Sequence, residues 1–126
     1  MPKIKVKSLE NLCAAQKLID CGMYTTSIHC SYYSSFLAMK HFLNNHPNKS
    51  LSYADQNSYS GKDSHNYIYD EVIKRMVNSI DIRDLRVQFR KLKADRKRAD
   101  YSDEQFTDLE SLDNIERSKK LQAKLK

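Results

Sequence analysis

A basic stretch near the end of the chain carries the residue types that bind anions. Residues 83–98 hold eight arginine and lysine side chains against two carboxylates. Five of the basic residues recur at helical spacing and form one stripe, made by Arg83, Arg86, Arg90, Lys93 and Lys97. A basic stripe along one helix predicts a polyanion-binding surface.

Arg96 departs from this pattern, because it falls on the apolar edge of the same expected helix. That edge is formed by Ile82, Leu85, Phe89, Leu92 and Ala99. A guanidinium buried without a partner is costly, so Arg96 needs a partner or a function. Asp100 lies one turn further on, and Tyr101 follows it. Two interpretations stay open: Asp100 holds Arg96 at the edge of the fold, or the two form a polar centre that recruits a phosphate or nucleotide.

The order of charges along the chain leaves a second interpretation of the basic stripe open. Residues 100–116 carry seven acidic groups and no basic one, and the final RSKKLQAKLK is basic again. Two adjacent helices of opposite charge can pair across an antiparallel interface. The stripe therefore predicts either a polyanion site or pairing with the acidic block, and the net charge of +6 does not decide between them.

His65 is the histidine placed best for chemistry. It stands in SGKDSHNYIYDEV, where a loop meets an expected helix, and there it can act as an acid–base group or bind a phosphate. The alternative is a capping or surface histidine. We expect His29 and His41 to be packing or surface residues, and Tyr32 and Tyr33 to be core residues. The sequence has no glycine-rich phosphate loop, HExxH motif or Cys/His cluster, so we expect no cofactor and no metal.

Length and composition predict one all-α domain over residues 1–126. With only 2 glycines and 2 prolines, the chain favours long helices over a hairpin-rich β fold. Three cysteines without CxxC spacing are typical of reduced thiols in a cytosolic protein. The N-terminus lacks a signal peptide pattern, and no apolar run is long enough to span a membrane. We expect a soluble cytoplasmic protein.

The apolar spacing predicts an antiparallel bundle of four or five helices. The expected helices cover residues 8–21, 25–45, 64–79, 82–101 and a final segment beginning after Ser102. Ser8 and Asp81 are expected N-caps, Gly22 is expected to end the first helix, and Ser102 with Gln105 forms an expected capping box. The final helix should turn inward Phe106, Leu109, Leu112 and Ile115. Outside the helices we expect a loose arm over 1–7, a polar loop over 47–63 and a frayed basic end over 117–126.

Three segments, in order from Gly22 onward, resemble the HEPN-domain family, in its small stand-alone bacterial and archaeal branch. SIHCSYYSSFLAMK, over residues 27–40, resembles the family's S-x-x-x-x-Y-Y-x-x-F-x-A helix. Ser64 and His65 resemble the Ser/Thr-His pair that opens the following helix. RKRADY, over residues 96–101, resembles the R-x-x-A-D-Y signature. The resemblance implies a four- or five-helix bundle that is usually dimeric.

Many HEPN proteins are metal-independent ribonucleases, often toxins paired with a minimal nucleotidyltransferase or part of defence systems. Those enzymes carry an arginine followed, after four to six residues, by a histidine. In this chain Tyr101 stands at that distance from Arg96, and no histidine follows any arginine at that spacing. A phenol titrates near pH ~10, far above an imidazole, so it does not exchange protons readily at neutral pH.

The hypothesis that follows is a HEPN-like protein that binds a nucleotide or RNA, as a homodimer and with a partner protein of the nucleotidyltransferase type. In it Arg96 binds phosphate, Tyr101 stacks or hydrogen bonds, Asp100 orients Arg96, and His65 lies nearby. Longer-range attraction comes from Arg90, Lys93 and Lys97. One alternative is a metal-independent endoribonuclease, in which His65 or Tyr101 moves protons. Another is a protein-binding scaffold without nucleic-acid contact.

Overall fold

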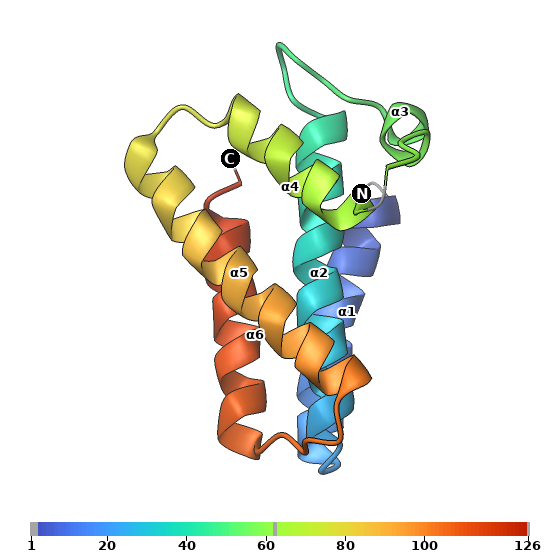
Figure 1. Cartoon of the computed structure of the whole chain (residues 1–126), viewed down its shortest axis with the longest axis vertical. Helices are drawn as coiled ribbons and strands as arrows, with labels where there is room; N and C mark the ends of the chain where they lie inside the picture. The colour runs from blue at the N-terminus through green and yellow to red at the C-terminus, as the bar shows by residue number, and fades with distance from the viewer. Residues whose placement is uncertain (1–2, 62, 126) are drawn as a thin grey trace.

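The computed structural model describes residues 3–61 and 63–125, and in these residues the protein contains helices and no strand (Figure 1). The helices are α1 (Lys3–Asp20), α2 (Tyr24–Asn44), α3 (Tyr53–Asn57), α4 (Ser64–Arg75), α5 (Ser79–Tyr101) and α6 (Asp108–Ala123). The all-α prediction is confirmed. No helix in the described ranges is long and apolar enough to cross a membrane.

Helix α2 lies at the centre and contacts all the other helices. Its apolar residues cover a broad arc, which explains why it packs on several neighbours at once. The main core joins α2 to α4, α5 and α6 and consists of Tyr32, Phe36, Met39, Leu43, Ile68, Tyr69, Val72, Leu85, Phe89, Leu92 and Leu121. This core fixes the relative positions of α2, α4 and α5, the three helices that carry the candidate site.

A seam of serines lets α1 and α6 approach α2 closely. The Ser8 hydroxyl donates to the Ser34 carbonyl at 2.8 Å, and the hydroxyls of Ser35 and Ser118 lie 2.6 Å apart. Each pair satisfies buried polar groups that would otherwise be costly. At the end of α1, Gly22 adopts a φ of 78°, as predicted for a glycine that follows a helix.

Both ends of the chain are more ordered than the sequence suggested. The predicted loose arm is wrong for residues 3–7, because α1 begins at Lys3 and Ser8 is a buried seam residue rather than an N-cap. The predicted frayed end is wrong as far as Ala123, because Leu121 is fully buried in the main core and anchors the last turns of α6. Residues 1–2 and 126, also part of those predictions, lie outside the described residues.

The polar segment 47–63 also contains more structure than predicted. Helix α3 forms within it, with the Ser52 side chain accepting a hydrogen bond from the Asp55 backbone N–H. The Gln56 side-chain amide donates to the carbonyls of Lys40 and Leu51, which ties the segment to the end of α2. The loop prediction is therefore wrong for residues 53–57, and Lys62 lies outside the described residues.

Two helix starts differ from those predicted. Asn78, not Asp81, is the N-cap of α5, since its side chain accepts from the backbone N–H groups of Ile80 and Asp81. The capping box before α6 is formed by Thr107 and Glu110, not by Ser102 and Gln105. The reciprocal bonds of this later pair satisfy two backbone donors at once. Ser102 instead follows the end of α5.

The later start of α6 changes which side chains point inward. Phe106 and Ile115 are buried as predicted, but Leu109 and Leu112 are 74% and 39% exposed, which contradicts the prediction. The buried face of α6 follows the small and polar residues that meet α2 and α5, listed in chain order as Ser111, Asn114, Ile115, Ser118 and Leu121. Apolar spacing alone did not reveal a buried face made largely of polar residues.

Candidate functional site

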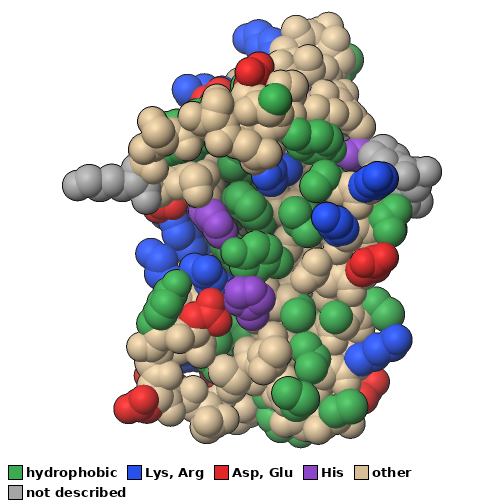
Figure 2. Space-filling view, turned by 90° about the vertical axis from the view of Figure 1, so that its right-hand side faces the viewer, with side chains coloured by type: hydrophobic (Ala, Val, Ile, Leu, Met, Phe, Trp, Pro, Cys, Tyr) green, Lys and Arg blue, Asp and Glu red, His purple; other side chains and the backbone are tan. Residues whose placement is uncertain are grey.

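Side chains from α2, α4 and α5 meet in one cluster, called here the Arg96 site. It consists of His29, Tyr32, Tyr33 and Phe36 on α2, His65 on α4, and Arg96, Asp100 and Tyr101 on α5. Figure 2 views the molecule from one side and shows hydrophobic and histidine side chains gathered in the middle, beside lysine and arginine side chains. The cluster brings together residues that are up to 72 positions apart in the chain.

Arg96 lies between two tyrosine rings. The guanidinium carbon is 5.6 Å from the centre of the Tyr32 ring and 5.7 Å from the centre of the Tyr101 ring. Its side chain is only 17% exposed, so the two rings face a charge that is largely removed from water. Cation–π contacts of this kind contribute about 0.5–2 kcal/mol. The rings therefore hold the guanidinium in place without using its N–H groups.

Asp100 is the charge partner of Arg96. Its Oδ2 lies 3.1 Å from Arg96 Nε, although the buried Nε–H makes no hydrogen bond of good geometry with any described group. The same oxygen lies 3.2 Å from His29 Nδ1. Asp100 thus bridges α2 and α5. The two Nη groups of Arg96 form no hydrogen bond among the described residues, so they remain for a ligand.

His29 belongs to the cluster, although the sequence suggested a packing or surface role. Its ring stacks on Tyr33 with centroids 4.6 Å apart, and its Nδ1 contacts Asp100. Nothing in the sequence pairs His29 with a residue 71 positions away. The one local signal is that His29 stands one helical turn before Tyr33, on the aromatic edge of α2.

His65 is fixed by a stack and a hydrogen bond. Its ring lies on Phe36 with centroids 4.1 Å apart, and its Nδ1 lies 2.6 Å from the Tyr32 hydroxyl. Burial first, and then the nearby Arg96 charge, lowers the pKa of His65, so the imidazole is neutral at neutral pH. The expected capping role belongs to Asp63, whose side chain accepts from the Asn66 backbone N–H.

The hydrogen bond to Tyr32 determines which nitrogen of His65 carries the proton. Burial raises the pKa of Tyr32, so its hydroxyl stays protonated. Tyr32 is buried, and His65 Nδ1 is the one hydrogen-bond partner of its hydroxyl among the described residues. A buried O–H without an acceptor is costly, so the favoured arrangement has the hydroxyl donating and Nδ1 accepting. The proton of the neutral imidazole is then on Nε2. His65 therefore offers an N–H donor, not a basic nitrogen, to a ligand.

A cavity of about 310 Å³ opens beside Arg96 and His65. It is lined by Asp63, Ser64, His65, Lys93, Arg96 and Lys97. Three of these side chains carry a positive charge and one carries a negative charge. Lys93 Nζ lies 2.8 Å from Asp63 Oδ2, and this contact lowers the pKa of Asp63. The cavity keeps two cations, Arg96 and Lys97, that Asp63 does not neutralise.

The structure therefore places the candidate residues in two groups. His65, Lys93, Arg96 and Lys97 line one cavity, and Asp100 and Tyr101 contact Arg96 from outside it. Arg90 is not part of this cavity and lies in a neighbouring groove on α5. Tyr101 is 76% exposed, so one face of its ring is open to solvent.

The charges of α5 are divided between its two sides, and pairing with the acidic block describes only some of the basic residues. Arg98 pairs with the acidic block, since its Nη2 lies 2.7 Å from Glu110 Oε2 and its Nε 3.2 Å from Glu104 Oε2. Arg90 and Lys97, on the side of α4, form no ion pair within the part of the chain that the structure describes.

Asp95 is a charged residue that sequence reasoning missed. It is 4% exposed, and its carboxylate accepts from Lys91 Nζ at 2.9 Å and from the Asn114 side-chain amide at 3.0 Å. The i, i+4 spacing of Lys91 and Asp95 was a usable signal. These contacts satisfy a buried carboxylate between α5 and α6, which is a structural role.

Comparisons with protein-family models, with curated proteins and with solved structures found no match for this chain. The relation to HEPN proteins therefore stays a prediction, based on the three segments named above. In the described ranges, no group of three or more His, Cys, Asp or Glu side chains is arranged to hold a metal ion.

Proposed function

We propose that the protein is a HEPN-like helical bundle that binds a phosphate of a nucleotide or RNA at the Arg96 site. The observation that carries the proposal is the state of Arg96, a guanidinium held between two tyrosine rings with both Nη groups left for a ligand. A partly buried arginine with unused donors matches a phosphate, which accepts two parallel N–H bonds from a guanidinium.

The neighbouring groups suit the same ligand. The Nε2–H of His65 and the ammonium of Lys97 line the cavity beside Arg96 and supply further donors to phosphate oxygens. Because Arg96 and His65 are partly buried, their interactions with an anion are stronger than they would be at a fully exposed surface. The exposed ring of Tyr101 offers a face on which an unpaired base stacks.

Binding of single-stranded RNA and of nucleotides, measured by fluorescence anisotropy over a range of salt concentrations, tests the proposal. We expect affinity to fall as salt rises, and Arg96→Ala to weaken it strongly. Arg83→Ala is the matched control, because Arg83 lies on the same helix with a side chain that is 73% exposed and outside the site. No binding at low salt, or equal loss in both variants, would contradict the proposal.

The resemblance also leads us to propose a homodimer with a partner protein of the nucleotidyltransferase type, within a toxin–antitoxin or defence system. Two copies with Arg96 facing a shared cleft would place two phosphate sites side by side. Sedimentation of the purified protein tests the dimer, and a monomer at micromolar concentration would contradict it.

A second candidate function is a metal-independent endoribonuclease. The observation that favours it is that His65 and Arg96 line the same cavity, where Arg96 would stabilise the charge of the transition state. The proton on Nε2 fits His65 as a donor to the leaving group and disfavours it as the base that starts the reaction. RNA cleavage in EDTA that Arg96→Ala abolishes would support this function, and intact RNA at high protein concentration would contradict it.

A third candidate, a protein-binding scaffold, is favoured by the pairing of Arg98 with Glu104 and Glu110, which uses part of the basic stretch for structure. A scaffold predicts no salt-dependent RNA binding. The anisotropy titration above therefore separates it from the first proposal.

A further inference from the structure

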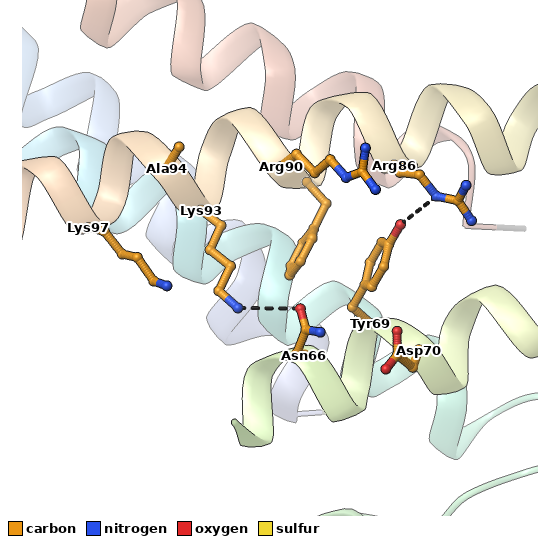
Figure 3. A pocket seen from close by; sticks show the side chains of 9 residues that line it. Asn66, Tyr69, Asp70, Arg86, Arg90, Lys93, Ala94 and Lys97 are labelled. Carbon is orange, nitrogen blue, oxygen red and sulfur yellow. Dashed lines mark hydrogen bonds between the residues drawn. The ribbon is translucent and has the colours of Figure 1, made fainter. Parts of the chain in front are cut away.

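A second cavity, larger than the one beside Arg96, is a groove between α4 and α5, called here the α4–α5 groove. It has a volume of about 560 Å³ and is lined by Asn66, Tyr69, Asp70, Arg86, Phe89, Arg90, Lys93, Ala94 and Lys97. Figure 3 shows Lys93 and Lys97 extending from α5 toward α4, which contributes Asn66, Tyr69 and Asp70. The resemblance to HEPN proteins assigns nothing to Arg86, Asn66 or Tyr69.

The positive charges in the groove repel one another, so they do not stabilise the folded protein. Arg86, Arg90, Lys93 and Lys97 follow one another at spacings of four, three and four residues. Like charges at these spacings destabilise a helix by about 0.2–0.5 kcal/mol a pair. Of the carboxylates nearby, Asp63 pairs with Lys93, and Asp70 lines the groove without forming an ion pair in the described residues. The surplus positive charge therefore attracts an anion to the groove.

Packed aromatic rings form the base of the groove. The rings of Tyr69 and Phe89 stack with centroids 4.4 Å apart and 10° between their planes. Arg86 Nε donates to the Tyr69 hydroxyl at 3.0 Å, and Lys93 Nζ lies 5.9 Å from the centre of the Phe89 ring. These contacts hold two of the four cations over a fixed apolar surface, so binding an anion requires little further ordering of the side chains.

The groove and the cavity of the Arg96 site share the side chains of Lys93 and Lys97. A ligand held at Arg96 can thus continue along α5 past four cations. At 1.5 Å per residue, the row from Arg86 to Lys97 is about 16 Å long. At ~3.4 Å per nucleotide, a stacked strand needs about five nucleotides to follow it.

We infer that the α4–α5 groove binds a single-stranded polynucleotide along its length, with one phosphate of the strand at Arg96. This inference rests on the proposed function and narrows its ligand from any nucleotide to a strand of several nucleotides. A single row of cations can follow a single sugar–phosphate backbone. The exposed ring of Tyr101 can stack only on a base that is not paired. Both features favour a single strand over a duplex.

The experiment compares uridine monophosphate with oligouridylates of increasing length. Affinity of the native protein should rise with length up to about five nucleotides and then level off. The double variant Arg86→Ala/Arg90→Ala should keep the affinity for uridine monophosphate. For the long strand, the variant should lose the gain in affinity that comes from length. The slope of log affinity against log salt should become less steep by about 1.4, because two phosphate contacts are lost.

Controls separate this inference from a general effect of charge and from the proposed function. Arg83→Ala/Lys119→Ala removes the same charge from outside the groove and should change neither slope nor affinity. Arg90→Ala alone breaks no ion pair or hydrogen bond among the described residues, so it keeps the test valid if the double variant is unstable. Arg96→Ala should weaken uridine monophosphate and long strands alike.

Three results would overturn the inference. One is equal affinity for uridine monophosphate and the long oligonucleotide, with binding still dependent on Arg96. The second is an equal loss in the groove variant and its charge-matched control. The third is binding of a duplex or of inorganic polyphosphate as tight as that of the single strand. Absence of all binding, or binding that ignores Arg96→Ala, would instead refute the proposed function itself.

Discussion

Replacing Arg96 with methionine separates a binding role from a structural one. Methionine keeps an unbranched stem that packs against the Tyr32 ring, and its sulfur makes favourable contacts with aromatic rings. The substitution removes the positive charge and all N–H donors. Asp100 loses one partner but keeps His29 and partial exposure to water. If Arg96 serves folding, the substitution should lower the stability of the protein. If Arg96 is kept for a ligand, the stability should change little and the affinity for RNA should fall.

The contacts of Arg96 predict a small change in stability. Loss of two cation–π contacts costs about 0.5–2 kcal/mol each, and loss of a partly exposed ion pair costs about 0–1 kcal/mol. Against these, removal of a buried N–H without a hydrogen bond returns about 1–3 kcal/mol. The two sides nearly cancel, so we expect the free energy of unfolding of Arg96→Met to lie within about 1 kcal/mol of the native value.

The same substitution should reduce RNA affinity by about tenfold to a hundredfold, because hydrogen bonds to a charged group are worth about 1.5–3 kcal/mol. Urea unfolding followed by circular dichroism measures stability, and anisotropy measures affinity for single-stranded RNA. A loss of more than about 3 kcal/mol in stability with unchanged affinity would refute the reasoning, since it would make Arg96 a structural residue.

Three further predictions concern neighbouring groups. Asp63→Asn should raise RNA affinity several-fold in an anisotropy titration, because asparagine caps a helix as well as aspartate while freeing Lys93; unchanged affinity would contradict it. The pKa of His65 is lowered in the folded state, so the unfolded chain binds more protons below pH ~6.5. The stability of the folded protein should therefore decrease as the pH is lowered through that range. In urea unfolding, His65→Phe should show a weaker fall, and an identical fall would exclude His65 as its source. Thr107→Ala should cost about 1 kcal/mol and Ser102→Ala only a few tenths, and the reverse order in thermal unfolding would refute the capping box.

The helical content was predictable because it depends on local signals. The scarcity of glycine and proline, together with apolar spacing, identified the long helices. The exact starts were harder, because several residues near each junction are good N-caps. Thr107, not Ser102, caps α6, because Phe106 is held just before it. The backbone N–H of Phe106 donates to Thr25 Oγ1, and the Phe106 side chain is buried. Such a long-range contact leaves no mark in the local sequence.

The candidate site was predictable in part for the same reason. Arg96 stood out because a charge interrupted an apolar stripe, and Asp100 lies one turn away on the same helix. The partners from α2 did not stand out. His29 joins Asp100, and Tyr32 fixes His65, only because the main core sets α2 against α4 and α5. Pairings between helices depend on packing that no single segment encodes.

A nuclear magnetic resonance titration of the labelled protein with a short oligouridylate tests the central claim most directly. We predict shifts of the Arg96 Nε–H and of backbone signals at His65 and Lys97, extending along α5 to Arg86, with little change in the serine seam around Ser34. No shift at saturating RNA, or shifts confined to residues away from the Arg96 site and the α4–α5 groove, would contradict the claim that phosphate binds at Arg96.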